Sequence, residues 1–193
     1  MNKLLLYGPM TMPTYVAMLR GINVGGNKRI KMDRLRASFA AVGCEQVQTY
    51  IQSGNVVFKS AKMAPATLAR KLEGRILQDF GFSALVITRT YEEMKQAVDD
   101  NPFLKERGID PERLHLVFLP EAPAPSALKE LAALTTEPDC SRCMGKEIYL
   151  YLPNGFAHSS LANNPIERRL LNRATTRNWR TVSKIYQMCQ DCA

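Results

Sequence analysis

The sequence predicts an α+β fold of two ferredoxin-like halves, each an antiparallel sheet with helices on one face. Residues 13–90 give the order strand, helix, strand, strand, helix, strand. Residues 113–193 repeat this order as strand, helix, strand, strand, helix, and then add a C-terminal helix. The chain has 193 residues and 46% hydrophobic composition, which is enough for a packed core. Only the order of secondary-structure elements repeats, because the two stretches share no sequence repeat.

The first half is expected to contain four strands and two helices. The strands are short apolar runs, expected at residues 15–19, 47–51, 56–58 and 84–88. The helices carry apolar side chains at helical spacing and end at glycine, which places them at residues 32–42 and 65–80. The polar turn Gln52-Ser53-Gly54-Asn55 joins the second and third strands and predicts an antiparallel hairpin.

A connecting segment, residues 91–112, follows Thr90, which forms a capping-box pattern with Glu93. In the second half, strands are expected at residues 114–119, 139–143 and 147–152, and helices at 128–134, from Asn164 onward and from Thr176 onward. Asn164 and Pro165 are typical of a helix start, and Thr176 is predicted to cap the last helix. Residues 1–12 are expected to be an N-terminal extension outside the fold, which is either added by an upstream translation start or a tail of the native chain.

Positive charge is concentrated in two segments. The net charge is +8, whereas residues 20–36 and 167–184 each carry +5, so the remainder is slightly acidic. We expect the two segments to meet, with Arg20, Lys28 and Lys31 facing Arg177 across a depression that attracts anions. The sequence contains no apolar run of membrane-spanning length and no signal-peptide pattern, which predicts a cytoplasmic protein without a membrane partner.

The loop at residues 19–32 combines glycines, asparagines and cations between a strand and a helix. Glycine and asparagine tolerate positive φ, and the cations suit phosphate, carboxylate or a nucleic-acid backbone. A surface loop with solvated charges is the alternative. A P-loop is excluded because Asn27 stands where its lysine belongs, and the dinucleotide-binding glycine pattern is absent.

Five cysteines are expected to be free thiols. Two C-x-x-C pairs, Cys140/Cys143 and Cys189/Cys192, raise the question of zinc. The gap between the pairs is far longer than in a zinc ribbon, and a strand points residues three apart to opposite faces. We therefore predict no metal and no cofactor.

Four segments resemble the bacterial family called domain of unknown function 1697: residues 15–26 (YVAMLRGINVGG), 50–58 (YIQSGNVVF), 147–150 (EIYL) and 175–179 (TTRNW). The resemblance runs over about residues 12–187 and implies a compact α+β fold, but no established activity, substrate or catalytic residue. Family motifs fall on Arg20, Gly21, Asn23, Gly25, Gln52, Ser53, Gly54, Asn55, Thr176, Arg177, Asn178 and Trp179. The terminal cysteines and Asn164-Pro165 depart from the family pattern.

The leading functional hypothesis is a binding module for a phosphate-bearing ligand, namely a nucleotide, a phosphometabolite or a nucleic acid. The candidate binding residues are Arg20, Gly21, Asn23, Gly25, Lys28, Lys31, Gln52, Ser53, Asn55, Thr176, Arg177 and Asn178. No carboxylate or histidine falls in the motifs, so no catalytic residue is assigned. Two alternatives remain: an enzyme that uses the loop as an anion cradle with Ser53 or Thr176 near the reacting group, and a structural or protein-interaction domain. RNA-recognition stacking is excluded, because Asn55 and Val56 stand where aromatic residues are needed.

Overall fold

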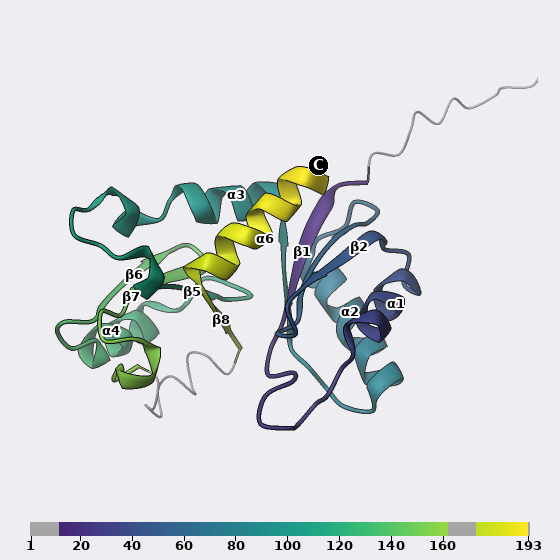
Figure 1. Ribbon diagram of the computed structural model, residues 1–193, viewed down its shortest axis with the longest axis horizontal. Helices are drawn as coiled ribbons and strands as arrows, with labels where there is room; N and C mark the ends of the chain where they lie inside the picture. Colours follow the sequence, from purple (N-terminus) through teal and green to yellow (C-terminus); the bar gives the residue numbers. More distant parts are fainter. Residues whose placement is uncertain (1–11, 162–172, 193) are drawn as a thin grey trace, which may run out of the picture.

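The computed structural model describes residues 12–161 and 173–192 (Figure 1). Two four-stranded antiparallel sheets have the orders β2-β3-β1-β4 and β6-β7-β5-β8. In each sheet the first strand in the chain lies between the third and the fourth, which is the ferredoxin-like order. The predicted fold class of two ferredoxin-like α+β halves is therefore confirmed.

The first sheet and the helices on its outer face come from the N-terminal part. Their bounds are β1 (Thr14–Leu19), β2 (Glu45–Tyr50), β3 (Asn55–Lys59), β4 (Val86–Thr90), α1 (Met32–Ala40) and α2 (Pro65–Phe80). Alternate side chains of β1, such as Tyr15 and Ala17, pack with Leu35 and Leu72 of the two helices. Every residue of β1 is buried, which explains its unbroken apolar sequence.

The second sheet and its associated elements complete the described chain. They are β5 (Leu114–Phe118), β6 (Cys140–Met144), β7 (Glu147–Tyr151), β8 (Thr175–Asn178), α4 (Pro125–Leu134), α3 (Tyr91–Asp99), α6 (Trp179–Cys192) and the 3₁₀ turns at Pro102–Lys105, Pro111–Arg113 and Phe156–His158. Leu131 and Leu134 of α4 pack near Val117 and Ile148 on one face of this sheet.

Helices α3 and α6 lie between the two sheets (Figure 1). One core cluster joins Val16 and Val57 of the first sheet, Leu116 of the second, and Val182 and Ile185 of α6. The prediction that helices cover only one face of each sheet is therefore wrong. Both faces are covered, because the face opposite the outer helices is apolar as well. The subdomain boundaries at residues 91–112 stay a prediction, since α3 packs into this shared core.

Two sequence assignments need correction. Residues 175–178 form the edge strand β8, in which Thr176 pairs with Val117, so Thr176 does not cap the last helix. The Oδ1 atom of Asn178 accepts a hydrogen bond of 2.9 Å from the N–H of Thr181 and takes that role. The fourth strand begins at Val86, two residues later than predicted. The helix start expected at Asn164 and the extension up to residue 11 lie outside the described residues.

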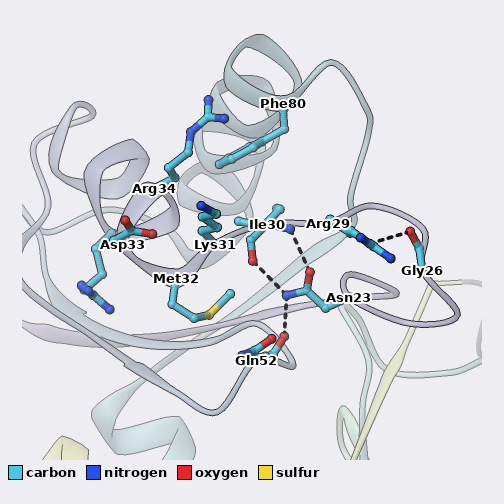
Figure 2. A pocket seen from close by; sticks show the side chains of 11 residues that line it. Asn23, Gly26, Arg29, Ile30, Lys31, Met32, Asp33, Arg34, Gln52 and Phe80 are labelled. Atoms are coloured by element: carbon cyan, nitrogen blue, oxygen red, sulfur yellow. Dashed lines mark hydrogen bonds between the residues drawn. The ribbon is translucent and has the colours of Figure 1, made fainter.

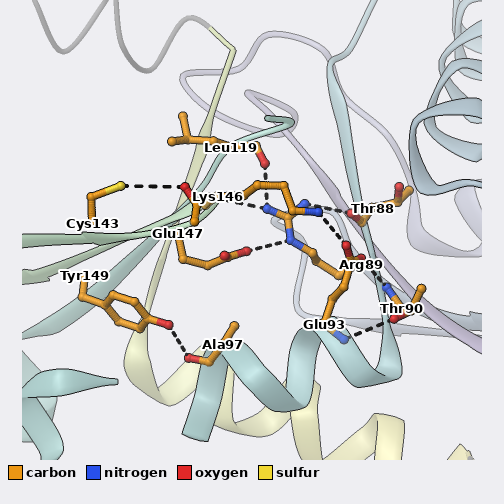
Figure 3. A network of polar contacts seen from close by, with 11 residues as sticks. Thr88, Arg89, Thr90, Glu93, Ala97, Leu119, Cys143, Lys146, Glu147 and Tyr149 are labelled. Carbon is orange, nitrogen blue, oxygen red and sulfur yellow. Dashed lines mark hydrogen bonds and ion pairs between the residues drawn. The ribbon is translucent and has the colours of Figure 1, made fainter. Parts of the chain in front are cut away.

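Arg89 of β4 joins the two sheets (Figure 3). Its Nε donates to Glu147 Oε1 at 2.8 Å, and its Nη2 donates to Leu119 O at 2.6 Å, both in the second sheet region. The capping box predicted from Thr90 and Glu93 is present at the start of α3. Buried polar contacts of this kind require defined geometry, so they fix how the sheets meet.

Within residues 12–161 and 173–192, no helix has the length and apolar character needed to cross a membrane.

Candidate functional site

Asn23 holds the loop between β1 and α1 in shape. Its backbone is left-handed, with φ of 56°. Its Oδ1 accepts from the N–H of Ile30 at 2.8 Å, while its Nδ2 donates to Ile30 O at 3.0 Å and to Gln52 O at 2.8 Å (Figure 2). The side chain thereby closes the loop and fastens it to the β2–β3 turn. Asparagine suits this position because it tolerates the left-handed region and offers both a donor and an acceptor.

An open depression of about 900 Å³ lies beside this loop, at the start of α1 (Figure 2). Its lining comes from the loop, the first turn of α1, the β2–β3 turn and the end of α2: Asn23, Gly26, Arg29, Ile30, Lys31, Met32, Asp33, Arg34, Arg36, Gln52 and Phe80. Four of these side chains are cationic and one is a carboxylate. The depression therefore carries a positive potential that favours anions.

The four cations of the depression, Arg29, Lys31, Arg34 and Arg36, are exposed. Arg29 Nε donates to a loop carbonyl at 3.2 Å, Arg34 Nη2 donates to Asp79 O at 3.1 Å, and Arg36 Nη1 donates to a threonine hydroxyl at 2.9 Å. In the described ranges none of the four forms an ion pair with a carboxylate. Arg29, Arg34 and Arg36 are therefore held by neutral oxygen acceptors.

Helix α1 begins at the wall of this depression. Lys31 is its N-cap residue and provides no side-chain hydrogen bond to the first turn. The first N–H groups of a helix lack intrahelical partners and carry partial positive charge. The depression therefore combines cationic side chains with an uncapped helix start.

Arg177 of β8 reaches across to the first sheet. Its Nε donates to Asn55 Oδ1 at 2.6 Å, and its Nη2 donates to Leu19 O at 2.9 Å and Ser53 O at 3.0 Å. Its Nη1 donates to Thr175 Oγ1 at 2.7 Å and to Thr176 O at 2.8 Å. Because a guanidinium has five N–H donors, all are used within the protein. Burial lowers the pKa of Arg177 to about 10.

Asn55 and Ser53 complete this junction. Asn55 is fully buried, and its Nδ2 donates to Ser53 Oγ at 2.9 Å and to Tyr50 O at 3.3 Å. Within the described chain, the hydroxyl of Ser53 accepts its hydrogen bond from this amide and has no histidine or carboxylate partner. A serine nucleophile needs an adjacent base. Ser53 and Asn55 therefore help to join the two sheets through hydrogen bonds, and Ser53 has no base among the described residues that would make it a nucleophile.

The structure divides the predicted site residues between two places. Asn23, Lys31 and Gln52 line the depression, whereas Ser53, Asn55, Thr176 and Arg177 meet at the junction. The others lie nearby or elsewhere: Lys28 Nζ donates to Ser83 O, the Arg20 N–H donates to Leu85 O, Gly21 and Gly25 have positive φ, and Asn178 caps α6. The two basic segments thus meet through Arg177 at Leu19 O, next to Arg20, but this contact is a network of hydrogen bonds inside the protein.

The sequence alone does not identify Arg29, Arg34, Arg36 or Phe80 as site residues. The available signal was the charge of residues 20–36, which includes the three arginines. Helical periodicity predicts that Arg34 and Arg36 lie on the polar face of the helix, but it does not predict what that face borders. Helical spacing puts Phe80 with the other apolar side chains of α2, and only the fold brings it to the depression.

Gly54 shows how tightly the turn is packed. Its φ is +78°, and an added Cβ would lie 2.7 Å from Leu19 Cβ and 2.9 Å from Ile22 Cδ1. We expect Gly54→Ala to lower the free energy of unfolding by about 2–3 kcal/mol, from backbone strain and overpacking together. The measurement is urea unfolding. Gly81→Ala is the matched control, because Gly81 has φ of +74° but no atom within 4 Å of an added Cβ. Equal losses in the two variants would show that packing at Gly54 contributes nothing.

The cysteines of the described residues are thiols. Cys140 and Cys143 lie on β6, whereas Cys189 and Cys192 are buried in α6. Burial raises the pKa of Cys189 to about 12. Over residues 12–161 and 173–192, no group of three or more His, Cys, Asp or Glu side chains is arranged to hold a metal ion.

The family model described as "Protein of unknown function (DUF1697)" matches residues 12–149. Among solved structures, the conserved bacterial protein SP0830 from Streptococcus pneumoniae is similar, with a TM-score of 0.77 and 25% sequence identity. The similarity covers 93% of this chain and 99% of that chain, so it extends over both sheets. No curated protein matches the chain.

Proposed function

We propose that this chain, which belongs to the DUF1697 family, binds a phosphate-bearing ligand in the depression beside α1. The observation that supports the proposal is the group of four cations, Arg29, Lys31, Arg34 and Arg36, which have no carboxylate ion-pair partner in the described chain. Guanidinium groups bind phosphate oxygens through paired N–H donors. A nucleotide, a phosphometabolite and a nucleic acid all present this chemistry.

The position of these cations favours an anionic ligand energetically. Lys31 and Arg34 lie at the positive end of α1, where the helix dipole disfavours each cation by about 0.3–1 kcal/mol. Mutual repulsion adds to this cost. A phosphate placed among the cations would reverse both effects, because it attracts the side chains and the N–H groups of the first turn.

The described residues favour binding over catalysis. The lining of the depression contains Asp33 as its single carboxylate and has no histidine or cysteine. General acid–base catalysis needs a titratable group positioned near the reacting atoms. The alternative hypothesis of an enzyme therefore has no supporting observation in this site. The cytoplasmic location predicted from the sequence stays a prediction.

The proposal predicts a specific stabilisation by phosphate compounds. Pyrophosphate at about ten times its Kd should raise the melting temperature by roughly 3–6 °C. Sodium chloride at equal ionic strength should not. The rise in melting temperature caused by pyrophosphate should largely disappear in Lys31→Ala and Arg34→Ala. Differential scanning fluorimetry measures the melting temperatures.

Arg107→Ala is the control, because Arg107 is an exposed cation in the connecting segment, residues 91–112. This variant should keep the full gain. Comparison between variants also removes the general stabilisation that excluded salts give to any protein. Equal gains in wild type, Lys31→Ala and Arg34→Ala would rule out a ligand site at this depression.

A further inference from the structure

A row of cations and aromatic rings borders the depression. The Arg34 guanidinium carbon lies 5.0 Å from the ring centroid of Phe80, and Phe80 lies 6.2 Å from the ring centroid of Phe82 at an interplanar angle of 33°. Lys28 Nζ lies 5.8 Å from the ring centroid of Phe82. We call Arg34, Phe80, Phe82 and Lys28 the cation–aromatic row. Two neighbouring aromatic rings therefore lie between two cations in this row.

The fold holds this row in place. Phe80 is the last residue of α2, and Gly81 ends the helix with a left-handed backbone and an N–H bond to Leu77 O. Arg34 donates to Asp79 O at 3.1 Å, and Lys28 Nζ donates to Ser83 O at 2.7 Å. Both rings are half-buried, so each packs on the outer core while part of it stays exposed. A preformed row loses little conformational freedom when a ligand binds.

The distribution of charge matches an extended anion. Residues 12–90 contain twelve Lys and Arg against four Asp and Glu, whereas the described residues beyond 90 contain eleven against thirteen. The positive charge therefore belongs to the half that carries the row. The same half also exposes Lys62, Arg70 and Lys71, which do not line the depression. A small phosphate compound would use only the depression, but a polyanion would interact with the whole half.

We infer that the ligand of this site is a single-stranded nucleic acid, which contacts the cations through its phosphates and stacks its bases on Phe80 and Phe82. The inference rests on the proposed function and specifies its ligand. Proteins that bind single strands combine a positive groove with aromatic side chains, because every base has a face that can stack. A duplex covers those faces by base stacking. The face of β3 turned away from α1 and α2, which RNA-recognition sheets use, is closed here, since Asn55 and Val57 on that face are buried.

The test is fluorescence anisotropy with a labelled oligouridine, the same sequence in duplex form, and inorganic polyphosphate as competitor. Phe80→Leu and Phe82→Leu keep an apolar side chain and remove the ring. Each should weaken oligouridine binding by roughly tenfold. Phe82→Leu should not change the stabilisation by pyrophosphate, because Phe82 does not line the depression.

Lys28→Ala gives a second test that does not touch the core, because Lys28 is exposed. Loss of one phosphate contact should reduce the slope of log affinity against log salt concentration by about one. Lys129→Ala is the control, since Lys129 is an exposed cation on α4 of the second half. It should leave both affinity and slope unchanged.

Each outcome decides between the two proposals. Wild-type affinity in Phe80→Leu and Phe82→Leu, equal binding of duplex and single strand, or absence of oligouridine binding would overturn the inference. If pyrophosphate still stabilises the protein in a Lys31- and Arg34-dependent way, the anion site stands without the nucleic acid. If that stabilisation is absent as well, the proposed function fails with it.

Discussion

Replacing Arg89 by methionine is expected to lower the free energy of unfolding by about 3–5 kcal/mol, because it breaks a buried ion pair from one side. The Arg89 side chain is 2% exposed and that of Glu147 is 13% exposed, so solvent screening is weak. Methionine fills much of the volume but leaves the Glu147 carboxylate and Leu119 O without their donor. Urea unfolding followed by circular dichroism measures the loss.

The double variant Arg89→Met/Glu147→Leu should recover much of this loss. Replacing both partners of a buried pair by apolar residues removes the uncompensated charge and is often close to neutral. Lys95→Ala is the control, because the Lys95–Asp99 pair is about half exposed and should contribute below about 1 kcal/mol. A double variant no more stable than Arg89→Met would contradict this account of the junction.

Most of the fold was predictable because its strands and helices carry strong local patterns. The apolar run of β1 and the glycine-ended periodicity of α2 indicate elements without any knowledge of their neighbours. The strand β8 was missed for a physical reason. Its sequence, Thr-Thr-Arg-Asn, is short and polar, and pairing with β5 together with the contacts of Arg177 makes it a strand. Tertiary context overrides local preference at such positions.

The candidate site was predictable only in part. The loop residues Asn23 and Lys31 were found because glycine, asparagine and cations occur together in one short segment. Phe80 and Phe82 belong to the row only because the end of α2 folds back beside the loop, about fifty residues away in sequence. Helical periodicity identifies an inward-facing ring, but it does not show which part of a half-buried ring stays exposed.

Arg177 illustrates the limit of reading charge as function. Basic residues in a motif suggested a ligand contact, yet its acceptors include Leu19 O and Ser53 O from the other half of the chain. Both lie more than 120 residues away, so local sequence does not reveal them. Family motifs that seemed to describe one binding site therefore include residues that join the two sheets.

We expect Arg177→Ala to lower the free energy of unfolding by about 3–4 kcal/mol, because several acceptors at the junction lose their donor together. The affected groups are Leu19 O, Ser53 O, Asn55 Oδ1, Thr175 Oγ1 and Thr176 O. Water that enters the vacated space will satisfy some of them, which keeps the loss below the sum of five separate bonds. Urea unfolding measures the effect.

Arg177→Lys should restore less than half of this loss. A lysine ammonium has three donors at one point, whereas the guanidinium spreads five donors over a plane and reaches both sheets. Arg173→Ala is the matched control, since the Arg173–Glu121 pair is more than 70% exposed on both sides and should contribute below about 1 kcal/mol. If Arg177→Ala loses no more stability than Arg173→Ala, Arg177 does not hold the sheets together, and its donors become candidates for binding an anion after all.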